Sequence, residues 1–464
     1  MTTIRPLTVA LAAALVGACS LAPTYERSAA PVPAQWPIAP AASTAPAAID
    51  LPWRDYFADA RLREVIELAL AHNRDLRVAA LNIERARALY RIQRADLLPT
   101  LDINGGQNTQ RVPERLSQSG EAQINRQYSA ALATSWELDF FGRINSLREQ
   151  ALESYLATEE ARRAAQISLV AAVADAWLTL AANHELLDLA QRTFATQRQS
   201  VELIRKSADA GAASALDLAQ ARTAMERARA DSARYTAQLT RAQNALTLLV
   251  GGAVPVPLQA ERLTDVVATV AELPLGIPSE VLVKRPDVLQ AEHLLQATNA
   301  NIGAARAAFF PRISLTASTG SASGDLDDLF ESGTRIWTFV PQITLPIFHA
   351  GALAANLDRA TIERDIGIAQ YEKAIQTAFR EVADALADHA TLAEQLDARR
   401  NLIAAANETY HLSEARYQHG LDSHLTLLDA QRSQYAAEQE LIATRLAEVS
   451  NRVALYKVMG GGWQ

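Results

Sequence analysis

The sequence predicts an α+β membrane protein made of two tandem repeats, each with two β-strands and one long antiparallel helical hairpin. Three observations support this fold class. Residues 143–250 contain no proline and a single glycine, Gly211, in a stretch rich in good helix formers. Two strand-like stretches precede this hairpin. The same plan then returns at an offset of about 209 residues, which indicates an internal duplication.

The N-terminus resembles that of a bacterial lipoprotein. Arg5 precedes the apolar run 7–16, which is too short to span a bilayer, and residues 15–19 resemble a lipobox that ends at Cys19. We therefore expect a signal peptide over 1–18, a covalent lipid on Cys19 and a Pro/Ala-rich tether over 19–58. The alternative is an ordinary signal peptide with an incidental cysteine.

The first repeat is expected over residues 59–252. Helical patterns begin at Asp59 and break near residues 72–73, and strands follow at about 100–112 and 123–138. The second strand alternates apolar residues such as Tyr128, Leu132 and Trp136 with small polar ones, so one face is suited to lipid. A half-buried strand in a soluble sheet is the alternative. The hairpin over 143–250 turns at Gly211, and its second helix has apolar residues on a seven-residue spacing.

The second repeat is expected over residues 279–459, after a proline-containing linker at 253–278. Its strands fall at about 312–322 and 335–346, and its hairpin over 350–459 turns at Gly420. Residues 460–464 form a tail. The landmark pairs Gly211 and Gly420, and Gly251 and Gly460, share the same offset and align the two repeats.

Composition excludes several classes of function. A net charge of −8 argues against nucleic acid as a partner. The eight histidines are scattered and Cys19 is the single cysteine, so we expect no metal site, and no nucleophile–base arrangement suggests an enzyme. No mature stretch reaches about 18 consecutive apolar residues, so a membrane crossing must use strands. Four strands are too few for a barrel of at least about eight, so several chains must contribute.

The sequence resembles the TolC-like outer-membrane efflux family, in particular its OprM/NodT-type lipoprotein branch. The motifs that carry the resemblance are found at 98–101, 135–143, 174–178, 285–288, 299–306, 309–311 and 425–432. The resemblance implies a homotrimer with a 12-stranded β-barrel in the outer membrane and a long α-helical barrel in the periplasm. Such a duct passively conducts small molecules from an inner-membrane pump of the resistance-nodulation-division class, through a periplasmic adaptor, and needs no cofactor beyond the lipid on Cys19.

The resemblance also implies a gate at the hairpin tips. Leu425, Asp429 and Arg432 match the family's tip motif, and their spacing places them on one helix face. Gly211 and Gly420 mark the turns where the adaptor is expected to dock.

Charged residues at both tips extend this expectation. We expect Asp209 and Asp217 to add to an acidic ring, with partners such as Arg205. His419 and His424 at the second tip are expected to be solvated surface residues, although a pH-sensitive tip is the alternative.

Two other functions stay open at this point. The chain is also compatible with the outer-membrane component of a type I protein secretion system, which belongs to the same family. A structural trimeric coiled coil or adhesin is a more distant alternative, and it predicts no insertion of the strands into a membrane.

Overall fold

The structure is a computed structural model that describes residues 20–37, 50–260, 262–266, 269–271, 273 and 279–462. The signal segment, Cys19 and parts of the expected tether, linker and tail lie outside the described residues. Contacts divide the chain into two units. Unit 1 comprises Met1–Ala29, Asn82–Glu159 and Gln290–Tyr371, and unit 2 comprises Ala30–Leu81, Glu160–Leu289 and Glu372–Gln464.

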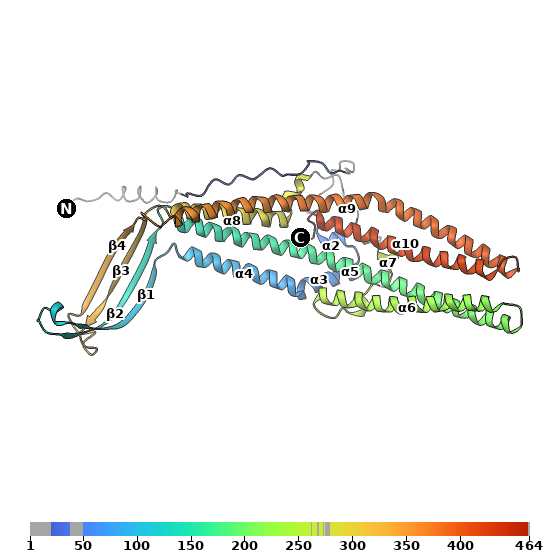
Figure 1. Cartoon of the computed structure of the whole chain (residues 1–464), viewed down its shortest axis with the longest axis horizontal. Helices are drawn as coiled ribbons and strands as arrows, with labels where there is room; N and C mark the ends of the chain where they lie inside the picture. The colour runs from blue at the N-terminus through green and yellow to red at the C-terminus, as the bar shows by residue number, and fades with distance from the viewer. Residues whose placement is uncertain are drawn as a thin grey trace. The chain divides into compact units, whose positions relative to one another are not determined.

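Long helices dominate both units (Figure 1). The two longest have 67 residues each, which corresponds to roughly 100 Å of helix. The main helices are α3 (Ala60–His72), α4 (Arg74–Ala95), α5 (Arg143–Asp209), α6 (Ala215–Val250), α8 (Pro286–Ala307), α9 (Ala352–Gln418) and α10 (His424–Val458). Local capping defines their ends. The carboxylate of Asp59, for example, accepts from the backbone N–H groups of Arg61 and Leu62 at the start of α3.

The seven-residue pattern of α6 buries one face of this helix. Its buried positions are Ala221, Ala228, Tyr235, Ala242, Leu246 and Val250. Near the tip of the first hairpin, Ala221 packs with Val201 and Ile204 of α5. Small residues on this face allow the two helices to approach closely along the hairpin.

The four strands form one antiparallel sheet in unit 1, in the order β1 (Thr100–Val112), β2 (Gln123–Leu138), β3 (Arg312–Ser323) and β4 (Arg335–Thr344) (Figure 1). Strand β2 of the first repeat pairs with β3 of the second, from Tyr128 opposite Ser323 to Leu138 opposite Ile313. The two repeats therefore share a single sheet, and β1 and β4 are its free edges.

The register gives this sheet two different faces. Residues directly opposite each other in paired strands project to the same face. Pairs such as Ile103 with Leu132 and Ile313 with Ile343 build an apolar face, and pairs such as Asn104 with Ala131 and Ser318 with Thr338 build a small, polar face. Every residue of β4 is exposed, and all but the last of β1. This alternation is the pattern of a strand with lipid on one side and water on the other.

The last part of the segment that we expected to be a tether, residues 53–57, is buried in the core instead. Trp53, Tyr56 and Phe57 are fully buried, and Trp53–Tyr56 forms the short helix α2. Tyr56 stacks on Tyr456 of α10 with 4.0 Å between ring centroids. The prolines favour an extended segment, but three aromatic side chains in five residues bury too much apolar surface to stay in solvent.

The first described residues form an extended arm that packs on α8. Arg27 makes two hydrogen bonds to the carboxylate of Glu292, at 2.7 and 2.8 Å, and the side chain of Glu292 is almost fully buried. Arg306 donates to the carbonyl of Leu21 at 3.1 Å. The arm thus brings residue 20, which follows Cys19 directly, to the end of α8 that leads into β3.

The described part of the expected linker also packs on its unit. It includes a 3₁₀ turn at Val256–Leu258 and a short helix, α7, at Leu263–Val266. Trp177 donates its indole N–H to the carbonyl of Leu258 at 2.8 Å. Leu263 and Val266 are fully buried, so this segment contributes to the core of unit 2.

Helix α5 contains one 18-residue window, with a mean hydropathy of 1.5, that is apolar and long enough to cross a membrane. Of this window, 56% is buried inside the protein, as expected of a core helix. The buried residues of α5 include Val173, Ala174, Trp177 and Leu178.

Candidate functional site

The tips of the two hairpins form the candidate site, and their turns share the same main backbone hydrogen bonds. At the first tip, Gly211 N–H donates to the carbonyl of Ala208 and Ala212 N–H to that of Ser207. At the second, Gly420 N–H donates to Tyr417 and Leu421 N–H to Arg416, each 209 positions later. Both glycines have positive φ, +77° and +70°, which only glycine adopts without strain.

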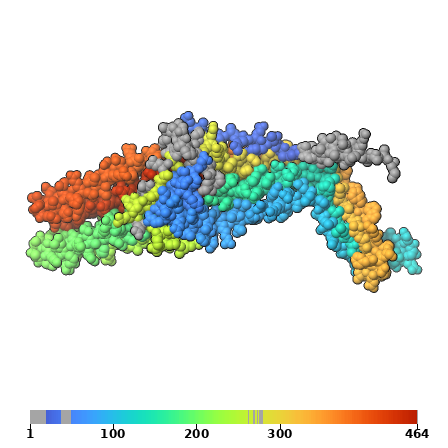
Figure 2. Space-filling model, turned by 180° about the vertical axis from the view of Figure 1, so that it is seen from behind, coloured from blue at the N-terminus to red at the C-terminus, as the bar shows by residue number. Residues whose placement is uncertain are grey.

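Both tips lie at the same end of unit 2, as the green and red hairpin ends show in Figure 2. The helices of the two hairpins contact each other near this end. Gln197 of α5 donates to Gln431 of α10 at 2.9 Å, and Tyr435 of α10 donates to Asp231 of α6 at 3.3 Å. These polar contacts, together with buried Ala228 and Ala430, hold the second hairpin against the first.

The predicted gate residues on α10 are surface residues of the protomer. Leu425 is 44% exposed, although most leucines of this helix are buried. Asp429 and Arg432 are also exposed, and their side chains form an ion pair of 3.2 Å within the helix. An exposed pair three residues apart contributes only a few tenths of a kcal/mol at most. The three side chains are therefore available to a neighbouring chain.

The two acidic residues of the first tip do not meet Arg205. Arg205 pairs instead with Glu202, one helical turn away, at 3.3 Å. Asp217 is the acidic member of a capping box: it accepts from the backbone N–H and the hydroxyl of Ser214 at 3.0 and 2.6 Å. These bonds hold the pKa of Asp217 below its ordinary value. Asp209 is exposed at the end of α5.

The expectation that both tip histidines are solvated is correct for His419 and wrong for His424. His419 is exposed, whereas His424, the first residue of α10, is only 4% exposed. Its ring lies 5.4 Å from that of Tyr417, and its Nδ1 has no hydrogen-bond partner among the described residues. Burial lowers the pKa of His424, and the nearby charge of Asp217 opposes this shift more weakly.

Sequence reasoning missed a second ion pair at the tips. Arg416 donates from Nε and Nη2 to the two carboxylate oxygens of Asp422, at 2.6 and 3.0 Å, and closes the second turn. The first tip has the capping box of Ser214 and Asp217 after its turn. A serine followed three residues later by an acidic residue is a known capping signal, so the sequence carried this information for Asp217.

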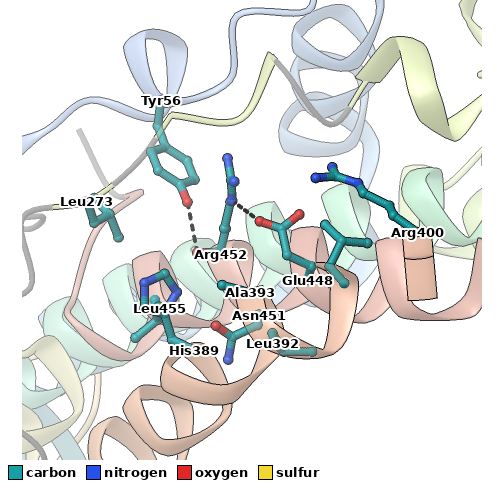
Figure 3. Close-up of a pocket in the computed structure, with 11 residues that line it drawn as sticks. Tyr56, Leu273, His389, Leu392, Ala393, Arg400, Glu448, Asn451, Arg452 and Leu455 are labelled. Carbon is teal, nitrogen blue, oxygen red and sulfur yellow. Dashed lines mark hydrogen bonds and ion pairs between the residues drawn. The ribbon is translucent and has the colours of Figure 1, made fainter. Parts of the chain in front are cut away.

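Elsewhere in the described part of the chain, cavities lie between helices. One of about 380 Å³ lies beside α9 and α10, with Tyr56, His389, Arg400 and Glu448 among its lining residues (Figure 3). Some of its polar groups are paired within the chain: Tyr56 donates to the carbonyl of Arg452 at 2.8 Å, and Arg452 pairs with Glu448. Within the described residues, no group of three or more His, Cys, Asp or Glu side chains is placed to hold a metal ion.

Comparison with known proteins places this architecture among outer-membrane ducts. A family model described as "Outer membrane efflux protein" matches residues 65–252 and 277–461. Two Pseudomonas putida proteins, the antibiotic efflux pump outer membrane protein ArpC and the toluene efflux pump outer membrane protein TtgC, are each 51% identical over 462 residues. The alignments cover 98% of this chain and 95% of each relative.

A solved structure shows the same fold. The chain is similar to the Neisseria gonorrhoeae MtrE outer membrane channel, determined in its open state, with a TM-score of 0.86 and 40% identity. The match covers 96% of this chain and 99% of that structure.

Proposed function

The chain belongs to the outer membrane efflux protein family, and we propose accordingly that it is the exit duct of a tripartite efflux pump. It lies in the outer membrane and conducts small molecules to the exterior. The observation that carries this function is the single sheet with one apolar and one polar face, connected along the chain to helices of about 100 Å. Passive conduction needs no catalytic group, and the energy comes from the pump.

The free edges of the sheet support a homotrimer. Strands β1 and β4 are exposed, and each has a row of backbone groups without a neighbouring strand. A lipid environment does not tolerate such edges. Three copies joined from β4 to β1 give a closed barrel of twelve strands, which satisfies every edge, and the hairpins of the three copies then surround a common lumen.

The partners and substrates follow from the relatives. Both relatives are named as components of efflux pumps, one for antibiotics and one for toluene, which favours small molecules over secreted proteins. We infer that this duct receives apolar or amphipathic small molecules from an inner-membrane pump of the resistance-nodulation-division class. A periplasmic adaptor would dock at the turns marked by Gly211 and Gly420.

Deletion of the gene in its host tests this function. Growth inhibition should occur at severalfold lower concentrations of some antibiotics or solvents, and a plasmid copy should restore resistance. The strain must express the partner pump actively. Unchanged susceptibility across a broad panel under that condition would exclude efflux as the function.

We propose that Leu425, Asp429 and Arg432 form the gate at the tip. The support is their exposure on one face of α10, where the side chains are free to meet a neighbouring copy. The double variant Asp429→Ala, Arg432→Ala should raise single-channel conductance in planar bilayers severalfold, because the tip would lose ion pairs between copies.

The exposed pair Glu226 and Arg229 on α6 provides a matched control, because it has the same spacing and a similar distance, 3.1 Å. Alanine at both of these positions should leave conductance unchanged. If both double variants behave like the parent protein, Asp429 and Arg432 do not hold the duct closed.

We also propose that Cys19 is acylated and inserts into the inner leaflet of the outer membrane. The docked arm supports this placement, because residue 20 lies where α8 leads into β3, at the end of the sheet connected to the helices. That end is therefore periplasmic, and the opposite end of the sheet faces the exterior.

A further inference from the structure

Three arginines occupy the exterior end of the apolar face of the sheet. Arg126 lies two residues beyond Tyr128 on β2, and Arg335 lies two residues beyond Trp337 on β4. Arg111 on β1 is opposite Ile124, so it projects to the same face as Arg126. All three side chains are exposed. Two strands thus repeat one pattern, an arginine just outside an aromatic residue on the membrane-facing side.

The spacing places these arginines at the level of lipid headgroups. Trp136 and Tyr128 are the aromatic residues nearest the periplasmic and exterior ends of the apolar face on β2. Eight residues (136 − 128) separate them, which corresponds to about 26 Å along the strand and about 20 Å across the membrane at the usual tilt. Tyrosine and tryptophan favour the interface, so Arg126 and Arg335, two residues further out, reach the phosphate layer.

The three guanidinium groups are unpaired in the described part of the chain, although the loops before β2 and β4 carry carboxylates, among them Asp328 and Glu331. None of them takes part in an ion pair or a side-chain hydrogen bond there, and Glu114 and Glu121 of the adjoining loop form no ion pair with them. At the periplasmic end of the same sheet the situation is different, because Arg143 and Arg312 share the carboxylate of Glu137 at 2.9 and 2.5 Å.

Arg111 and Arg126 are also diagonal neighbours. Arg126 is opposite Thr109, and Arg111 is two residues further along β1. Diagonal residues in paired strands are about 7–8 Å apart, and two like charges on such neighbours repel each other, which favours binding of an anion near both. A phosphate of the headgroup layer is an anion within reach of side chains on this face, and the loop carboxylates form no ion pair with either arginine.

Assembly completes the cluster. Arg111 lies on the edge strand β1 and Arg335 on the edge strand β4. This step rests on the proposed function, because in the closed barrel β4 of one copy lies beside β1 of the next. Each junction between copies then holds arginines from two chains on the membrane-facing side, with the aromatic rings below them.

We propose that Arg111, Arg126 and Arg335 bind the phosphate groups of the anionic glycolipid of the outer leaflet. Guanidinium groups bind phosphate through two parallel hydrogen bonds, and Tyr128 and Trp337 provide ring surfaces for the first carbons of the acyl chains. The site fixes the exterior rim of the duct to the lipid layer, as Cys19 fixes the periplasmic side.

Lipid retention by the full-length, acylated protein tests the proposal. The protein is reconstituted into phosphatidylcholine vesicles containing bis-phosphorylated lipid A, extracted with mild detergent and examined by native mass spectrometry. The parent trimer should retain lipid A. The triple variant Arg111→Gln, Arg126→Gln, Arg335→Gln should lose affinity by on the order of 100-fold, given a contribution of about a factor of five from each arginine. Lysine at the same positions should retain an intermediate affinity.

Controls separate this site from general charge and from the proposed function. Glutamine at Arg198, Arg222 and Arg241, three exposed arginines of α5 and α6, removes the same charge and should leave lipid A bound. Dephosphorylated lipid A should bind weakly, and so should phosphatidylglycerol. Trimers that conduct ions but retain lipid A equally in the parent and the glutamine variant would overturn this inference alone. A parent protein that forms no conducting trimer would overturn the proposed function.

Discussion

At the scale of single residues, the hairpin tips show how neighbours decide the role of a charged or titratable side chain. Asp217 uses its carboxylate to cap α6, Arg416 closes a turn with Asp422, and His424 is buried beneath its own turn. Asp429 and Arg432, by contrast, face solvent on the same helix as His424. The first group stabilises the tip within one chain, and the second is available for contacts between chains.

Burial of His424 predicts a tip that weakens in acid. Its pKa in the folded tip lies below the ordinary value of 6.5, so the folded state keeps the ring neutral where the unfolded chain binds a proton. The neutral ring of His424 therefore contributes its full stabilisation of the folded tip above about pH 6.5. This contribution is lost as the pH falls below that value. Hydrogen-exchange protection factors of residues 417–428 should drop severalfold between about pH 7.5 and about pH 5.5.

The variant His424→Phe keeps a ring in the same place and should remove this pH dependence. His419→Gln, at the exposed histidine of the same tip, should keep it. Equal pH dependence in the His424→Phe variant and the parent protein would show that another group controls the tip.

At the scale of elements, the sheet depends on close contact between strands of different repeats. Gly320 of β3 lies opposite Ala131 in the neighbouring strand β2. A Cβ atom at this glycine would be 2.1 Å from the carbonyl oxygen of Ala130 and 2.5 Å from the Cα of Ala131. Glycine is needed because backbone, rather than a flexible side chain, fills this space. This contact lies within the β2–β3 pairing that joins the two halves of the duplicated chain in the sheet.

Gly320→Val should therefore prevent β2 and β3 from pairing. The amount of folded protein recovered from the outer membrane should fall at least about 10-fold, because backbone overlap of this size cannot relax without breaking the pairing. Gly106→Val is the matched control: Gly106 lies on the same polar face in β1, and a Cβ atom there would meet none of the described residues within 4 Å. Comparable yields for the two variants would contradict the assigned pairing.

At the scale of the whole molecule, duplication and the proposed lipid anchor have two different roles. Duplication supplies four strands and two hairpins per chain, and the open edges of β1 and β4 require further copies to close the sheet. The N-terminal arm, bound through Arg27 and Glu292, ties the expected lipid to the periplasmic end of that sheet. The strands supplied by duplication and the expected lipid would both hold the chain at a fixed position in the outer membrane.

Cys19→Ser tests the lipid anchor. The variant should fail to incorporate labelled palmitate, and its signal peptide should remain uncleaved or be cut elsewhere, because acylation of the thiol precedes cleavage before the cysteine. A variant in the arm, Arg27→Gln, should still be labelled. Unchanged processing and membrane fractionation of the Cys19→Ser protein would show that residue 19 carries no lipid.

Local patterns in the sequence are sufficient to define the elements. Helix formers without proline, a strand alternation around Tyr128 and Trp136, and glycines 209 positions apart are enough to predict two strands and one hairpin per repeat. They also place Leu425, Asp429 and Arg432 on one helix face. Each of these inferences uses neighbours within a few turns of chain, where backbone geometry fixes which residues are close.

Contacts between distant groups, in contrast, emerge only in the folded chain. Folding pairs β2 with β3, places Arg27 on Glu292, and brings Tyr56 onto Tyr456. These contacts join residues as much as several hundred positions apart, and the free energy of each depends on burial and on competing partners in space. Folding also brings Arg111, Arg126 and Arg335 to one face, because register is a property of paired strands and not of any strand alone.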